Sequence, residues 1–402
     1  MPALAAEPSA EAIVKTYGDI ALAAYSDALD KAEALGAAVD QLIADPSEDT
    51  LAAARAAWEA ARPPYQQSEA FRFGNPVVDD WEGDVNAWPL DEGLMDYVDA
   101  ASYGSESDEN GLYTANVIAN TSISIDGRAV DVSRITPELL KNTLREAGGV
   151  EANVATGYHA IEFLLWGQDL HGTGPGAGER PATDYSATAC THGHCDRRAQ
   201  YLKAATDLLV ADLKEMAADW QPGGAARQSL EQTGISAILV GMGSLSYGEL
   251  AGERMKLGLL LHDPEEEHDC FSDNTPISHL NDAIGIRDAY HGHYQRLDGT
   301  SIDGPSLSDL VKASDPALDA ELSGKLDVSV RKMEAIEKRR ENGEAYDQQI
   351  AEGNAEGNAT VQAAIDALVD QTKSIERVVS ALKLDAIAFE GSDSLDAPDQ
   401  VF

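Results

Sequence analysis

The stretch GYHAIEFLLWGQDL, residues 157–170, places one histidine and one glutamate inside an otherwise apolar run. His159 and Glu162 are three positions apart, so a helix brings their side chains onto one face, with Cβ atoms about 5–6 Å apart. An imidazole and a carboxylate at that spacing can hold one metal ion, and the apolar neighbours would bury it. Because a buried carboxylate needs a partner, the pair predicts a cation, a hydrogen-bond donor or a proton here.

The chain on both sides of this stretch is also predicted to be helical. Apolar residues recur at three- and four-residue steps over 11–44, and Ser47 is placed to cap a second helix that Pro63-Pro64 is expected to interrupt. Similar periodicity returns over 196–220, 226–262 and after residue 306. The fold class is therefore predicted to be mainly all-α: two packed helical bundles with long loops and at most a small β-hairpin. The predicted domains are residues 8–184, which carry the motif, and 196–402.

Irregular regions separate the periodic segments. Residues 74–93 are rich in acids and tryptophan and are expected to be a loop that packs on the body of the protein. Residues 121–132 alternate around an Asp-Gly pair, which favours the hairpin. Residues 171–189 are expected to be a plain Gly- and Pro-rich loop. Residues 272–305 are expected to be rich in loops, with solvated histidines at the positions that follow: His279, His291 and His293.

Charge and hydropathy restrict the partners and the location. The chain has 70 acidic and 29 basic side chains, a net charge of −41. Nucleic acids and anionic membranes both require clustered Lys and Arg, so neither is expected to bind, and an acidic, solvated surface is the simplest explanation of the charge. No apolar run is long enough to span a membrane. The Ala3-Leu4-Ala5 piece is typical of the end of a secretory signal, which predicts an exported protein.

Cys190 and Cys195 enclose the short loop CTHGHC. In an oxidising compartment this pair is expected to form a disulfide. Two alternatives remain open: a soft metal site completed by His192 and His194, and free thiols.

Five blocks of the sequence resemble the imelysin family, also called imelysin-like peptidases, and in particular its iron-regulated protein A branch. The family marker Gly-x-His-x-x-Glu corresponds to Gly157, His159 and Glu162. The five blocks are VNAWPLDEGLMDYVD at 85–99, GYHAIEFLLWGQDL at 157–170, GMGSLSYGELAGERMKLGL at 241–259, HDPEEEHDCFSDNT at 262–275 and EGSDSLDAPDQVF at 390–402. The resemblance implies two helical bundles with the motif near their junction. It also implies export to the periplasm or the outer-membrane face, and a link to metallopeptidase activity or to iron uptake.

The favoured interpretation is a metal site, with iron as the first choice and zinc as the alternative. The other interpretation is that His159 and Glu162 only hydrogen-bond each other and a neighbouring helix. His159 and Glu162 supply two ligands, and the expected additions are Glu69, which the resemblance to an iron-transport domain suggests, and Asp91. Arg254 is expected to neutralise buried carboxylates or to clamp an anionic ligand such as a siderophore or haem carboxylate. The other candidates for ligand binding are Glu253, Ser244, Trp88 and Glu92.

Two other functions remain open. A metallopeptidase could use the same motif, although Phe163 follows Glu162, so neither His-Glu-x-x-His nor His-x-x-Glu-His is present. A scaffold that docks to an outer-membrane receptor would need no metal. The expected partners are a metal ion or an iron complex, together with a periplasmic or outer-membrane component of iron uptake.

Overall fold

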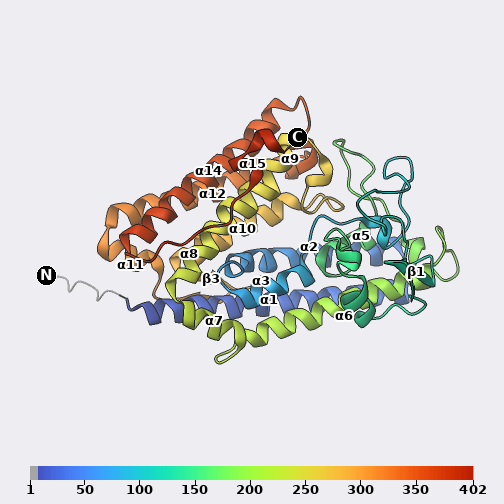
Figure 1. Cartoon of the computed structure of the whole chain (residues 1–402), viewed down its shortest axis with the longest axis horizontal. Helices are drawn as coiled ribbons and strands as arrows, with labels where there is room; N and C mark the ends of the chain where they lie inside the picture. The colour runs from blue at the N-terminus through green and yellow to red at the C-terminus, as the bar shows by residue number, and fades with distance from the viewer. Residues whose placement is uncertain (1–7, 402) are drawn as a thin grey trace.

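The computed structural model describes residues 8–401, and helices dominate it (Figure 1). The predicted mainly-α fold class is confirmed. The described strands form two short antiparallel hairpins: β1 (Ser122–Ile125) with β2 (Arg128–Asp131), and β3 (His293–Gln295) with β4 (Ser301–Asp303). The sequence does not predict the second hairpin, because strands of three residues are too short to show alternation.

The first layer of helices is built on α1, a helix of 35 residues along the lower side of Figure 1. Helices α2 and α6 pack along α1, and α5 packs between α2 and α6. Ser47 begins α2 with a capping box, as predicted. The helices of this layer are α1 (Ala10–Ala44), α2 (Glu48–Ser68), α3 (Pro76–Val85), α4 (Pro137–Leu139), α5 (Gly157–Trp166), α6 (Cys195–Asp219) and α7 (Ala225–Thr233).

The second layer crosses the first at an angle and is built on α10, α12 and α14 (Figure 1). Helix α8 continues into a π-helix over Leu245–Lys256 and then into α9. The contact between α2 and α10 joins the two layers. The helices of this layer are α8 (Ile235–Ser244), α9 (Leu257–Leu261), α10 (Thr275–His291), α11 (Leu307–Ser314), α12 (Pro316–Glu341), α13 (Tyr346–Ile350), α14 (Ala355–Ala381) and α15 (Asp393–Asp396).

The expected interruption of α2 at Pro63-Pro64 is wrong, because the helix continues through both prolines to Ser68. Proline removes a backbone donor and crowds the preceding turn, but its φ is itself helical. Trp58, Arg62 and Tyr65 on either side of the prolines are fully or almost fully buried. Packing of this face against α1, α5 and α10 therefore outweighs the local cost.

Two regions expected to be loops contain helices. Residues 74–93 include α3, which starts with Pro76 at its first turn. Residues 272–305 include α10, a helix of 17 residues that is buried around most of its circumference. Polar residues such as His279 and Asp282 lie inside the protein on α10, so the sequence shows no apolar stripe. Gly285 permits the contact with α2, since an added Cβ would lie 2.4 Å from the carbonyl oxygen of Gln67.

The boundary between domains at residues 184–196 stays a prediction. Helix α6, which lies after that boundary in sequence, packs along α1 in the first layer. The expected signal remnant at Ala3-Leu4-Ala5 lies outside the described residues. Among the described helices, none is both long enough and apolar enough to cross a membrane.

Candidate metal centre

The motif helix α5 is fixed at its first residue. Gly157 has a φ of +79°, and an added Cβ would lie 2.3 Å from the carbonyl oxygen of Val85 at the end of α3. Only glycine fits such a close approach at positive φ. At the next residue, Trp58 of α2 donates from its indole N–H to the carbonyl oxygen of Tyr158 at 2.9 Å. Every residue of α5 is buried, which confirms the buried helix that the sequence predicts.

The motif pair forms one end of a buried polar network. Nδ1 of His159 lies 3.0 Å from Oε2 of Glu162. The other oxygen of Glu162 accepts from the backbone N–H of Ser272 at 3.0 Å and from its hydroxyl at 2.7 Å. Glu162 therefore ties α5 to the segment 267–274, which leads into α10. When Glu162 is ionised, His159 donates from Nδ1 and leaves a lone pair on Nε2, as metal-bound histidines usually do.

His159, His268 and Asp269 come together from two segments far apart in sequence. One ligand atom of each lies within 4.8 Å of the others, and all three residues are at most 2% exposed. The rings of His159 and His268 are 4.7 Å apart, and Nδ1 of His268 lies 3.7 Å from Oδ1 of Asp269. Nε2 of His159 and Nδ1 of His268 have no hydrogen-bond partner. We call these three residues the histidine–aspartate cluster.

A third imidazole extends this row. His279 of α10 lies 6.3 Å from His268, measured between ring centres, and neither of its nitrogens has a partner. Burial and the nearby Arg254 lower the pKa of His279 to about 3. Burial and Arg62 lower the pKa of His159 to about 3, and burial also lowers the pKa of His268 well below its usual value. The imidazoles are therefore neutral, which is the form that binds metals.

Asp269 supplies the negative charge of the cluster. Burial alone would raise its pKa, but Arg62 and the neighbouring hydrogen bonds lower it below the usual value, so the group is ionised. Arg62 donates to Oδ1 at 2.8 Å, while Asn274 and Ser278 donate to Oδ2. A metal would share Oδ1 with Arg62. The guanidinium holds the carboxylate in place and also reduces its attraction for a cation.

Glu69, predicted as a metal ligand, lies in a separate ion-pair network. Arg254 donates to Glu69 at 2.7 Å, to Asp282 at 3.2 Å and to Glu249 at 2.9 Å. Arg254 is 2% exposed, so it neutralises buried carboxylates, which was one of its two expected roles. Glu69 is 1% exposed, and its nearest basic partner is this guanidinium.

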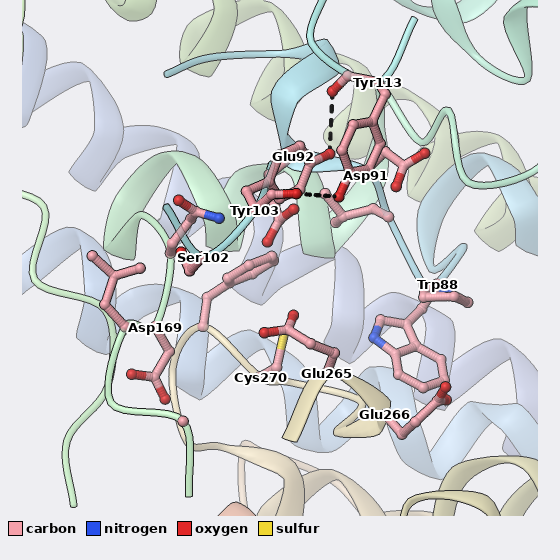
Figure 2. A pocket seen from close by; sticks show the side chains of 16 residues that line it. Trp88, Asp91, Glu92, Ser102, Tyr103, Tyr113, Asp169, Glu265, Glu266 and Cys270 are labelled. Carbon is pink, nitrogen blue, oxygen red and sulfur yellow. Dashed lines mark hydrogen bonds between the residues drawn. The ribbon is translucent and has the colours of Figure 1, made fainter. Parts of the chain in front are cut away.

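An acidic cavity of about 440 Å³ lies beside the histidine–aspartate cluster (Figure 2). Its walls come from residues 88–92, 168–170, 265–266 and 270–271, together with Ser102, Tyr103, Tyr113 and Gly172. Figure 2 shows Glu92 and Glu265 pointing into the space from opposite walls. Trp88 lines the cavity, and its ring lies 5.7 Å from that of His268, so Trp88 lies next to both the cavity and the cluster.

The charge of this cavity responds to pH near neutrality. Burial and the nearby Glu265 raise the pKa of Glu92 to about 8, and burial and Asp263 raise the pKa of Glu265 to about 7. Asp91 lines the cavity and accepts from Asn110, and it does not belong to the histidine–aspartate cluster. The candidates Asp91, Glu92 and Trp88 thus share one cavity wall.

The other candidates lie elsewhere. Ser244 is buried on α8, and its hydroxyl accepts from the backbone N–H of Glu390, which holds the C-terminal segment. Glu253 is exposed. Cys190 and Cys195 are joined in a disulfide, which precedes the long helix α6. His293 pairs with Asp303 across the second hairpin.

Sequence reasoning missed His268, Asp269, Arg62 and His279 as members of the site. His279 was expected to be solvated, yet both His279 and His268 are buried. The available signal was the run HDC at 268–270, in which a histidine, an aspartate and a cysteine follow one another.

The fold and the cluster define a class: a two-layer, mainly helical protein with neutral histidines and an ionised carboxylate buried where α5 meets the segment before α10. The imelysin family model matches residues 21–375, and the chain belongs to the imelysin family. No curated protein matches the chain significantly. A similar solved structure is that of a candidate iron-regulated protein A precursor from Parabacteroides distasonis, with a TM-score of 0.66 and 21% identity over 94% of this chain and 96% of that one. This likeness is one of fold.

Proposed function

We propose that this imelysin-family protein is exported and serves iron acquisition by binding a metal ion, or a metal complex, at the histidine–aspartate cluster. The observation that carries the proposal is that two buried histidines, each with one unpartnered ring nitrogen, bring a ligand atom within 4.8 Å of an ionised carboxylate. A buried polar atom without a partner costs about 1–3 kcal/mol. A bound metal would remove that cost at both nitrogens.

The donor set suits iron or zinc. Two imidazoles and one carboxylate are typical ligands of non-haem iron, and the same donors serve zinc. His159 and His268 would hold the metal through nitrogen and Asp269 through Oδ1. Glu162 would orient His159 from its other side, so its role is to position a ligand. The bound metal would supply positive charge and open coordination positions.

The acidic cavity is the proposed route of approach. Its carboxylates attract cations, and the ring of Trp88, which lines it, lies 5.7 Å from the ring of His268. A rotation of Trp88 would connect the two. Asp91, predicted from sequence as a metal ligand, and Glu92, predicted to bind a ligand, would bind the cation here before it reaches the cluster.

The link to iron rests on relatives. The Parabacteroides distasonis protein is described as iron-regulated and as a precursor. We extend both properties to this chain as part of the proposal, with a location in the periplasm or at the outer membrane. A component of an iron-uptake system is the proposed partner.

The geometry supports binding better than peptide hydrolysis. A catalytic zinc needs a water that can reach a substrate backbone. The three members of the histidine–aspartate cluster are at most 2% exposed. Glu162 already takes part in three hydrogen bonds, one with His159 and two with Ser272, which leaves it little freedom to act as a general base.

Metal analysis of the purified protein tests the proposal. The protein is stripped with a chelator, incubated with Fe²⁺ or Zn²⁺, desalted and measured for metal by mass spectrometry. We expect His159→Ala and His268→Ala to lower metal content at least about tenfold, the size of effect usual for site residues. His293→Ala is the matched control, because His293 is a half-exposed histidine outside the cluster.

Equal metal content in wild type, His159→Ala and His268→Ala would overturn the proposal. Chelator-sensitive cleavage of an unfolded protein, lost in the same variants, would favour the peptidase instead. Retention of an outer-membrane receptor by metal-free protein would favour the scaffold.

A further inference from the structure

A second group of potential ligands lies on the other side of His268. Glu267 precedes His268 in the chain, Asp273 follows a few residues later, and Asp347 comes from α13. One carboxylate oxygen of each lies within 4.8 Å of the others. None of these residues belongs to the histidine–aspartate cluster or to the Arg254 network.

The oxygens of this group lack partners although they are buried. Oε1 of Glu267, both carboxylate oxygens of Asp347 and Oδ1 of Asp273 accept no hydrogen bond. Glu267 and Asp347 are each 1% exposed. Buried polar atoms are nearly always satisfied, so several unsatisfied oxygens that face one another indicate a missing ligand.

No basic side chain forms an ion pair with the three carboxylates among residues 8–401. Arg340 and His171 lie close enough to favour the charged form of Asp273 and so lower its pKa, although burial raises it overall. Arg340 donates at 2.7 Å to the backbone carbonyl oxygen of Asp273 rather than to its carboxylate. Three like charges this close repel strongly in a buried setting, and a cation is the simplest compensation.

We propose that Glu267, Asp273 and Asp347 form a binding site for a hard divalent cation, with Ca²⁺ as the best fit. All three donors are oxygens, which such cations prefer. Ca²⁺ binds oxygen at about 2.3–2.6 Å, so two of its ligands can be up to about 5 Å apart, whereas Mg²⁺ at about 2.0–2.1 Å requires tighter spacing. Ca²⁺ also accepts a site built wholly from protein oxygens, whereas Mg²⁺ usually keeps several of its waters.

The cation would join two parts of the second layer. Glu267 and Asp273 lie at the two ends of the segment that carries His268 and Asp269, and α13 lies between α12 and α14. A bound ion would fix this segment against α13 and so hold His268 in its place next to His159. A cation at this oxygen-only site would thus stabilise the fold whether or not a metal is bound at the histidines.

Calcium titration of the chelator-treated protein tests this site. The thermal midpoint and the bound Ca²⁺ are measured at physiological salt, where diffuse attraction to the acidic surface is screened. We expect Ca²⁺ to raise the midpoint of the wild type, and Asp347→Asn to weaken Ca²⁺ binding at least about tenfold. Glu267→Gln should behave in the same way.

Two controls separate this site from others. Asp385→Asn removes one exposed charge outside the group and should bind Ca²⁺ like the wild type. His159→Ala should also keep the Ca²⁺ effect, so failure of the histidine site and failure of this site are distinguishable. Equal Ca²⁺ responses in Asp347→Asn, Asp385→Asn and wild type would overturn the proposal, and an equal response to Mg²⁺ would overturn the assignment to Ca²⁺.

Discussion

Substitution of Arg254 by methionine tests the energetic account of the site. Arg254 is the shared partner of Glu69, Asp282 and Glu249, and it lies next to the histidine row. Methionine keeps much of the volume but removes the charge and the donors. Glu69 and Asp282, both at most 1% exposed, would then be left without their cation.

The expected cost follows from this geometry. Removing one partner of a buried ion pair destabilises a protein by about 3–5 kcal/mol, because the other charge stays buried. Two buried carboxylates depend on Arg254, so we expect the upper part of that range. Glu69→Gln should cost less, since Arg254 keeps Asp282 and Glu249. The double variant Arg254→Met, Glu69→Gln should recover about 0.5–3 kcal/mol relative to additivity.

Denaturant unfolding of the metal-free proteins measures these differences. Arg377→Met is the matched control, because Arg377 pairs with Glu321 at the surface and should cost at most about 1 kcal/mol. Glu69→Gln should also leave metal content unchanged, in contrast to His159→Ala. If the free energy of unfolding of Arg254→Met lay within about 1 kcal/mol of the wild-type value, as is typical of surface pairs, the reasoning would be refuted. Loss of metal in Glu69→Gln would also refute it.

Three further predictions follow from the same contacts. Gly157→Ala should destabilise by more than about 1 kcal/mol, measured by denaturant unfolding, since it adds a clash with Val85 to the strain of positive φ. The free energy of unfolding of the metal-free protein should fall as pH drops from 6.5 toward 3, because the unfolded chain binds protons that the buried imidazoles of the folded protein do not bind. His279→Phe should reduce the slope of this free energy against pH by about one proton. Glu92→Gln should stabilise increasingly as pH rises from about 4.5 to about 8, because in that range the unfolded chain releases the Glu92 proton that the folded protein keeps; a pH-independent difference would contradict this.

Much of the fold is readable from local signals. The long helices α1 and α6 and the capped start of α2 follow from apolar periodicity and from a capping serine, and the Asp126-Gly127 turn gives the first hairpin. Helix α10 is different, because it is surrounded by protein and carries buried polar residues. Apolar periodicity detects helices that have one solvent-exposed face, so it fails for a helix that protein surrounds.

The candidate site was predictable only in part. His159 and Glu162 are local partners, and their 3.0 Å contact follows from helical spacing alone. His268 and Asp269 lie more than a hundred residues away in sequence, and no local rule connects them to the motif. Glu69 was expected to bind metal, but its neighbour in space is a guanidinium.

The sequence by itself determined the helical class, the family motif on a buried helix and the acidic surface, because these depend on composition and on spacing within one segment. The tertiary structure decided which charges meet. Whether a buried carboxylate faces Arg254, a histidine or another carboxylate depends on how α2, α5, α10 and α13 pack, and the chemistry of the site depends on that choice.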